Sequence, residues 1–133
     1  MSSQSLVCLD VGEKRIGVAV ADTAIRIAVA FDTIEVDGEE LNKIAEIVIR
    51  EGAQTIVVGY PRNQQGETTA QTSYVERFAE GLSEMAPKIV FQDESLTSVM
   101  AENRLVAMKK PYTKRDIDAQ AAVIILEDYM ETH

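Results

Sequence analysis

Two apolar runs near the start of the chain are joined by so short a turn that they are expected to pair with each other. Residues 5–11 are apolar on both faces, and residues 16–21 form a second apolar run after a tight turn at residues 12–14. Strands joined by a tight turn run in opposite directions, so these residues predict an antiparallel hairpin. A β-branched stretch within residues 27–36 predicts a third strand.

The spacing of apolar residues changes after residue 38. Apolar side chains recur at helical spacing up to a stop at Gly52, which predicts a helix over residues 39–51: Leu41, Ile44, Ala45 and Val48. Strands and helices then alternate. Strands are expected at 55–60 and 88–92. Helices are expected with one face marked by apolar residues from 75 to 82 and an end near Pro87, from 97 or 98 to about 108, and over 117–130. Strands separated by helices pair in parallel. We therefore predict an α/β fold of order β-β-β-α-β-α-β-α-α, with a mixed five-stranded sheet, one antiparallel strand and helices on both faces.

Length and charge limit the classes of function. The chain has 133 residues, enough for one domain, which we place over residues 1–133. Lys and Arg total 13 and Asp and Glu total 22, so the formal net charge is −9. This argues against a generic nucleic-acid coat or a polybasic membrane binder, because both capture phosphates with excess positive charge. A local basic site remains compatible with the charge.

Cysteine and histidine, which often act as nucleophiles, bases or metal ligands, occur only once each. Cys8 is the only cysteine, so an internal disulfide and a cysteine-based zinc site are excluded. The only histidine, His133, is the last residue, which disfavours a histidine base or metal ligand. In an enzyme of this composition, carboxylates have to do the proton and metal chemistry. No apolar run approaches the roughly 18 residues of a membrane span, so we expect a cytoplasmic protein without a membrane partner.

Acidic residues stand where a ligand is expected to bind. Ligands of open α/β sheets lie outside the carboxyl ends of the parallel strands. Asp10 ends the first strand, on the face that Leu6 and Cys8 bury, and Glu94 follows the fifth strand. Asp118 heads the buried stripe of the last helix. Each has an ordinary structural alternative, namely a turn aspartate, a solvated glutamate and a favourable charge near a helix N-terminus.

Four segments carry a resemblance to a known family. They are LDVGEKRIGVAVAD at 9–22, VVGYPRNQQG at 57–66, DESLTS at 93–98 and IDAQAAVIIL at 117–126. In order and spacing the chain resembles the YqgF/RuvX family over almost its whole length. That family consists of RNase H-like nucleases, described as Holliday junction resolvases and as nucleases that mature the 5′ end of pre-16S rRNA. The resemblance therefore implies an RNase H-like fold and a nucleic-acid substrate, either structured RNA or branched DNA.

The resemblance also implies the catalytic and metal-binding residues. The family's three carboxylates fall on Asp10, Glu94 and Asp118. Oxygen ligands of this kind suit Mg²⁺ or Mn²⁺, and the family implies two such ions and products with a 5′-phosphate and a 3′-hydroxyl. Ser95 departs from the family, which commonly has Arg there. The adjacent Asp93 fits the family pattern either as a carboxylate that orients a metal-bound water or as a cap of the next turn.

A basic segment precedes Asp118. Its four cations lie within seven residues, at Lys109, Lys110, Lys114 and Arg115. We predict that these residues, with Lys14, Arg15 and Arg62, bind the nucleic-acid backbone beside the metals, and that Tyr112 can stack on a base. The alternative is a merely solvated loop.

Other functions stay open beside hydrolysis of pre-16S rRNA. A junction resolvase would share the site but needs a symmetric dimer to make paired cuts, so the chain is expected to be a monomer or a homodimer. A non-catalytic nucleic-acid-binding or regulatory module would use the same carboxylates structurally. The hairpin at residues 10–12 also resembles the phosphate loop of actin and sugar kinases, which need two such domains.

Overall fold

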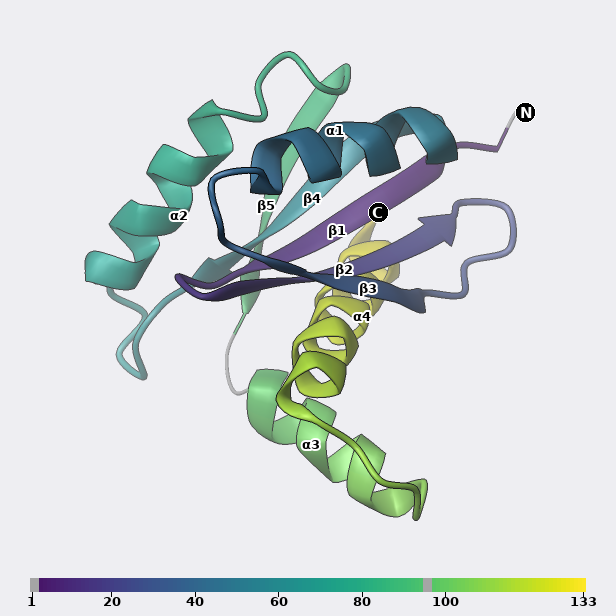
Figure 1. Ribbon diagram of the computed structural model, residues 1–133, viewed down its shortest axis with the longest axis vertical. Coiled ribbons are helices and arrows are strands. Elements are labelled where there is room, and N and C mark those ends of the chain that lie inside the picture. The colour runs from purple at the N-terminus through teal and green to yellow at the C-terminus, as the bar shows by residue number, and fades with distance from the viewer. Residues whose placement is uncertain (1–2, 95–96) are drawn as a thin grey trace.

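The computed structural model describes residues 3–94 and 97–133 (Figure 1). Its elements are β1 (Ser5–Val11), β2 (Arg15–Asp22), β3 (Val29–Glu35), α1 (Glu40–Glu51), β4 (Ala53–Pro61), α2 (Ala70–Glu80), β5 (Lys88–Glu94), α3 (Thr97–Ala107) and α4 (Lys114–Thr132). The sheet has the order β3-β2-β1-β4-β5. β2 runs antiparallel to both of its neighbours, and β1, β4 and β5 are parallel. The predicted mixed sheet with one antiparallel strand is confirmed.

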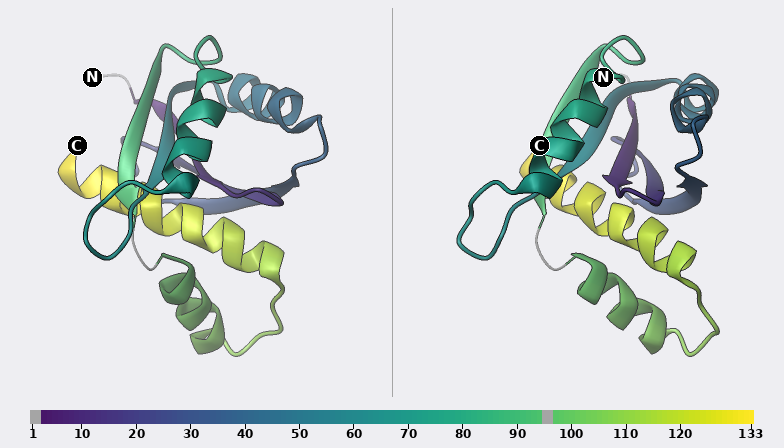
Figure 2. Two further views of the ribbon diagram at one scale, coloured as in Figure 1. Left: turned by 90° about the vertical axis from the view of Figure 1, so that its left-hand side faces the viewer. Right: turned by 60° about the vertical axis from the view of Figure 1, so that its left-hand side comes forward.

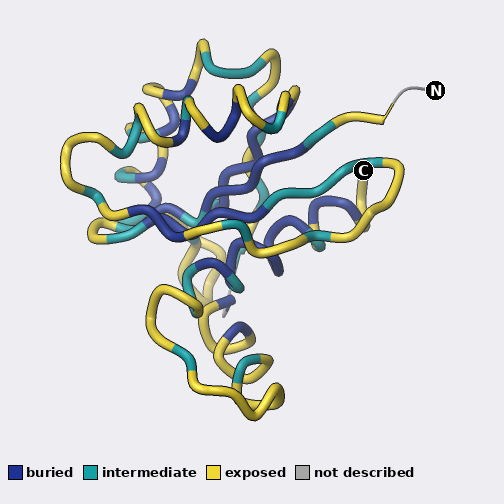
Figure 3. The backbone as a smooth tube through the Cα atoms, turned by 45° about the vertical axis from the view of Figure 1, so that its right-hand side comes forward, coloured by how far each residue is buried: buried dark blue, intermediate teal, exposed yellow. Residues whose placement is uncertain are grey.

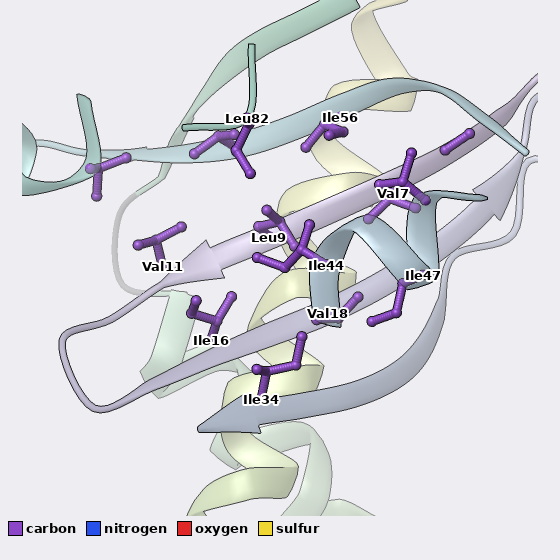
Figure 4. Packing of buried hydrophobic residues seen from close by; sticks show 14 residues of the cluster. Val7, Leu9, Val11, Ile16, Val18, Ile34, Ile44, Ile47, Ile56 and Leu82 are labelled. Atoms are coloured by element: carbon purple, nitrogen blue, oxygen red, sulfur yellow. The ribbon is translucent and has the colours of Figure 1, made fainter. Parts of the chain in front are cut away.

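The two faces of the sheet are covered by different helices (Figures 1 and 2). On one face, side chains of β1 and β2 pack against α1, as Figure 4 shows for Leu9, Val18 and Ile44. On the other face, Cys8 packs against Ile125 of α4. Because side chains of a strand alternate between faces, this arrangement buries β1 on both sides. The continuous apolar run of β1 follows from that double burial.

α3 lies outside these layers. It packs against α4, and the two residues it buries are Thr97 and Ala101. Figure 3 shows that most of α3 and of the segment leading to α4 is exposed. Across residues 3–94 and 97–133, no helix has the length and apolar character needed to cross a membrane.

Among the boundaries that differ from the sequence prediction, those of α4 and β5 concern the site. α4 begins at Lys114 rather than at residue 117, because Thr113 and Asp116 form a capping box that closes its first turn. Lys114 and Arg115 are therefore helical rather than part of a loop. β5 continues to Glu94 instead of ending at residue 92, because its pairing with β4 extends to Pro61. Glu94 thus lies at the end of a paired strand, which holds its backbone in place.

Candidate active site

Asp10 lies at the carboxyl end of β1, on the face that α4 covers. Its side chain is half-buried and follows Cys8 on the same side of the strand. The pKa of Asp10 is raised well above its ordinary value by burial, by the charges of Glu94 and Asp118, and by a hydrogen bond with the Glu94 side chain. Loss of water and like charges both disfavour a carboxylate. A cation bound beside Asp10 would therefore stabilise its carboxylate form.

Glu94 reaches Asp10 across the strand that separates them. β4 lies between β1 and β5, and its residue beside the Glu94 carboxylate is Gly59. A Cβ at Gly59 would lie 2.9 Å from Oε2 of Glu94, so the carboxylate passes over the space that a side chain would fill. Burial raises the pKa of Glu94, while the Thr97 hydroxyl donates to its Oε2 at 3.4 Å. The two predicted carboxylates are thus direct neighbours.

Asp118 is brought to the same edge by close packing of α4 on the hairpin. The backbone of Asp118 lies directly over Gly17, the β2 residue paired with Asp10. The stripe below Asp118 is buried as the sequence predicted, with Ala121, Ala122 and Ile125 fully covered. Small residues at a contact let backbones approach closely, and here a strand glycine does so. Asp118 therefore ends up near enough for its charge to raise the pKa of Asp10.

The carboxylate of Asp118 is held by an arginine. Nε of Arg15 lies 2.6 Å from Oδ2 of Asp118, and the two side chains are 28% and 23% exposed. This hydrogen bond and charge raise the pKa of Arg15. Within the described ranges 3–94 and 97–133, no group of three or more acids, cysteines or histidines is spaced to hold one metal ion. The three acids meet at one edge, with Asp118 turned to Arg15.

The donor set nevertheless fits a divalent cation. Asp10 and Glu94 offer hard oxygen ligands of the kind that Mg²⁺ and Mn²⁺ prefer, and their crowding is relieved by positive charge. Asp118 adds a third carboxylate beside Asp10. The side chains that would hold the metal are these three.

The predicted arginines of the nucleic-acid-binding set all have partners within the protein. Arg62 pairs with Asp93 at 3.0 Å and lies over the ring of Tyr60 at 4.8 Å. Asp93 is therefore an exposed partner of Arg62. Arg115 pairs with Glu35 and donates to the Thr33 carbonyl, and thus joins α4 to β3. Because these arginines already contact carboxylates of the protein, their binding to phosphate stays a prediction.

The predicted lysines lie on the surface. Lys14 is exposed at the β1–β2 turn, and the others, also exposed, flank the start of α4: Lys109, Lys110 and Lys114. The Tyr112 hydroxyl donates to Glu102 at 2.7 Å, which ties this segment to α3. Ser95, where the family's arginine is missing, lies outside the described residues.

An open groove lies beside Glu94. It has a volume of about 930 Å³ and lies between the loop after β4 and the helices α3 and α4. Its lining includes Arg62, Asn63, Glu94, Met100 and Asp128. Glu94 therefore borders a space large enough for parts of a polymer substrate.

Sequence reasoning missed the two glycines that assemble the site. Gly17 and Gly59 lie inside the strands predicted at 16–21 and 55–60, and the apolar pattern does not distinguish them from their neighbours. An isolated glycine inside a strand often marks close approach of another backbone, which was the available signal. The pairing of Arg15 with Asp118 had no such signal, because it joins residues far apart in the chain.

The chain is similar to known proteins over nearly its whole length. Residues 4–132 match the RuvX family, described as Holliday junction resolvase. A protein of Chloroflexus aurantiacus (strain ATCC 29366 / DSM 635 / J-10-fl), named "Putative pre-16S rRNA nuclease", is 40% identical over 98% of this chain and 89% of its own length. A protein of Staphylococcus carnosus (strain TM300) with the same name is 34% identical over 99% of each chain.

The fold has a counterpart among solved structures. RuvC of T. thermophilus, solved in complex with Holliday junction substrate, superposes with a TM-score of 0.59 over 97% of this chain and 94% of that chain. At 14% sequence identity, this likeness concerns the fold alone. The family match and the full-length relatives carry the assignment further. This chain, with its RuvC-like RNase H fold, belongs to the RuvX family.

Proposed function

We propose that this protein is a metal-dependent nuclease that processes the 5′ end of pre-16S rRNA in the cytoplasm. The observation that carries the proposal is the meeting of Asp10, Glu94 and Asp118 at the carboxyl edge of the sheet, where Asp10 has a raised pKa. The names of the relatives, at up to 40% identity over nearly the full length, support the choice of RNA.

The three carboxylates have distinct surroundings. Asp10 and Glu94 form the crowded, partly dry pair, and Asp118 is the more accessible third ligand. Two bound Mg²⁺ or Mn²⁺ ions would activate a water and stabilise the leaving oxygen, giving a 5′-phosphate and a 3′-hydroxyl. Lys14, Lys109, Lys110 and Lys114 would hold the backbone on both sides of this edge. Such contacts position a strand without reading its bases.

A second substrate has its own support. The description of the family as Holliday junction resolvase favours a four-way DNA junction. A resolvase makes paired cuts and works as a symmetric dimer, so the mass of the protein in solution bears on this choice. A monomer favours the RNA-processing role, and a stable homodimer favours the resolvase.

The test uses three substrates and matched variants. Wild type, Asp10→Asn, Glu94→Gln and Asp118→Asn are incubated with a pre-16S rRNA fragment, an unstructured RNA and a four-way DNA junction, with Mg²⁺, Mn²⁺ or EDTA. Asp93→Asn is the control, because Asp93 is an exposed acid next to Glu94 that pairs with Arg62. We expect metal-dependent cleavage of the rRNA fragment by wild type and the control, reduced by about 10³-fold or more in the other three variants. Equal cleavage by wild type and Asp10→Asn would refute the site, and binding without any cleavage would favour a non-catalytic module.

A further inference from the structure

Arg15 forms an ion pair with the carboxylate of Asp118, which the proposed reaction needs for metal binding. Its Nε lies 2.6 Å from Oδ2 of Asp118, and the hydrogen bond and charge of Asp118 raise the pKa of Arg15. A guanidinium and a divalent cation bind carboxylate oxygens through the same lone pairs. Contact of Asp118 with one therefore opposes its contact with the other.

The backbone of Arg15 is fixed while its side chain has room to move. The carbonyl of Arg15 accepts a hydrogen bond from the amide of Gly12 at 3.0 Å, and Arg15 is paired with Glu35 of β3 in the sheet. The side chain is 28% exposed, so water can solvate the guanidinium when it leaves Asp118. An ion pair with such access to water contributes little net free energy. Displacement by a divalent cation is therefore feasible.

The ion pair also separates two hollows of the surface. One, of about 320 Å³, is lined by Lys114, Ser98 and Ile117 among others, and the second, of about 420 Å³, is lined by Lys14, Gly12 and Gln71. Arg15 and Asp118 line both hollows. Opening the pair would join the two hollows into one path beside Asp118. Lys14, Arg15 and Lys114 line the joined hollows and supply three positive charges there.

We propose that Arg15 alternates between two partners, Asp118 and the substrate phosphate beside the metal. Coordination of a divalent ion by Asp118 releases the guanidinium, which then binds the phosphate through its planar set of donors. Metal binding would thereby decide both whether Asp118 is free of Arg15 and whether Arg15 is available to the nucleic-acid backbone. This inference rests on the nuclease function proposed above.

Direct binding of Mn²⁺, followed by calorimetry or by the electron paramagnetic resonance signal of the free ion, tests the competition without any cleavage. Arg15→Gln removes the competing cation, so Mn²⁺ is expected to bind about five-fold tighter than to wild type. Arg15→Lys keeps the charge but loses the planar fork, and its affinity is expected to lie between the two. Unchanged or weaker binding by Arg15→Gln overturns the proposal, as does absence of Mn²⁺ binding to wild type.

A double-mutant cycle separates direct competition from a general effect of charge. In an Asp118→Asn background the contact is already lost, so adding Arg15→Gln is expected to change Mn²⁺ affinity by less than about two-fold. Lys14→Gln removes a neighbouring exposed charge and is expected to leave Mn²⁺ affinity close to that of wild type. An undiminished effect of Arg15→Gln in the double variant means that the charge acts at a distance, which contradicts the proposal. Thermal unfolding of each variant checks that it is folded.

Cleavage supplies a second readout. Arg15→Gln is expected to reach half-maximal activity at a lower Mn²⁺ concentration, yet to cleave about ten-fold more slowly at saturating metal, because the phosphate loses a donor. Failure of this inference differs from failure of the nuclease function. If Asp10→Asn abolishes cleavage while Arg15→Gln leaves Mn²⁺ affinity unchanged, only the inference fails. If Asp10→Asn cleaves like wild type, the nuclease site itself is wrong.

Discussion

The main chain of Asp118 rests on Gly17, so that a Cβ at position 17 would overlap the carbonyl oxygen of Asp118. Gly17 is also the cross-strand partner of Asp10. One glycine in the hairpin therefore sets how closely α4 approaches the end of β1 at Asp118. The position of the Asp118 carboxylate thus depends on the lack of a side chain at residue 17.

Substitution of Gly17 by Ala is expected to push the start of α4 away from the sheet. The obstacle is backbone, which cannot rotate aside, so the change should cost about 1–3 kcal/mol of stability and most of the nuclease activity. Gly81→Ala is the matched control, because a Cβ there meets the end of the Leu41 side chain at 3.1 Å, which can shift. That Cβ would approach the Phe78 carbonyl oxygen only to 3.3 Å, whereas a Cβ at position 17 would overlap the Asp118 oxygen. Urea unfolding and metal-dependent cleavage measure the two effects. Full activity of Gly17→Ala would show that α4 need not lie this close.

Substitution of Gly59 by Ala is expected to affect the site more than the fold. A Cβ there would meet Glu94 and the Cδ1 atom of Ile125, at 2.8 Å for the latter, and both are flexible side-chain ends. Stability should fall by about 1 kcal/mol or less, whereas displacement of the Glu94 carboxylate should weaken Mn²⁺ binding by about ten-fold. Calorimetry with Mn²⁺ and thermal unfolding in EDTA separate these outcomes. A large loss of stability with unchanged Mn²⁺ affinity would contradict this reading.

Removing the charge of Asp10 is expected to stabilise the protein in EDTA at neutral pH. Burial and the neighbouring acids raise the folded-state pKa of Asp10, so the charged form is disfavoured in the folded protein. Below about pH 4, the ordinary pKa of aspartate, Asp10 is protonated in both states and the penalty is absent. The penalty grows as the pH rises from the ordinary pKa toward the raised pKa, and it is constant above the raised pKa. Asp10→Asn should therefore melt at least about 3 °C higher than wild type at pH 7, with a difference that shrinks toward pH 4.

The control for this pH dependence is Asp93→Asn, since Asp93 is exposed and paired with Arg62. Its melting temperature should stay close to that of wild type over the same pH range, because exposed ion pairs contribute little. A gain that is equal for the two variants would mean that overall charge, rather than the crowding at Asp10, is responsible.

The basic residues near α4 are expected to separate into two groups. Lys109, Lys110 and Lys114 are exposed, so changing each to Gln should lower the salt dependence of RNA binding, by about one in the slope of log K against log salt, at unchanged stability. Arg115 joins α4 to Thr33 and Glu35 of β3, and Arg115→Gln should cost about 1 kcal/mol or more of stability. Filter binding at several salt concentrations and thermal unfolding measure these effects. A flat salt dependence of the wild type would contradict backbone binding altogether.

The sequence determined the order of the elements, the single antiparallel strand and the candidate acids, because apolar periodicity and strand ends are local properties. It misplaced the start of α4, where the capping box of Thr113 and Asp116 adds a turn. Only the tertiary structure decided that Glu94 reaches Asp10 over Gly59, and that Asp118 rests on Gly17 and faces Arg15. These contacts depend on which side chains are missing between distant segments and on which cation lies nearest. The apolar periodicity of the chain gives no information on the missing side chains or on the nearest cation.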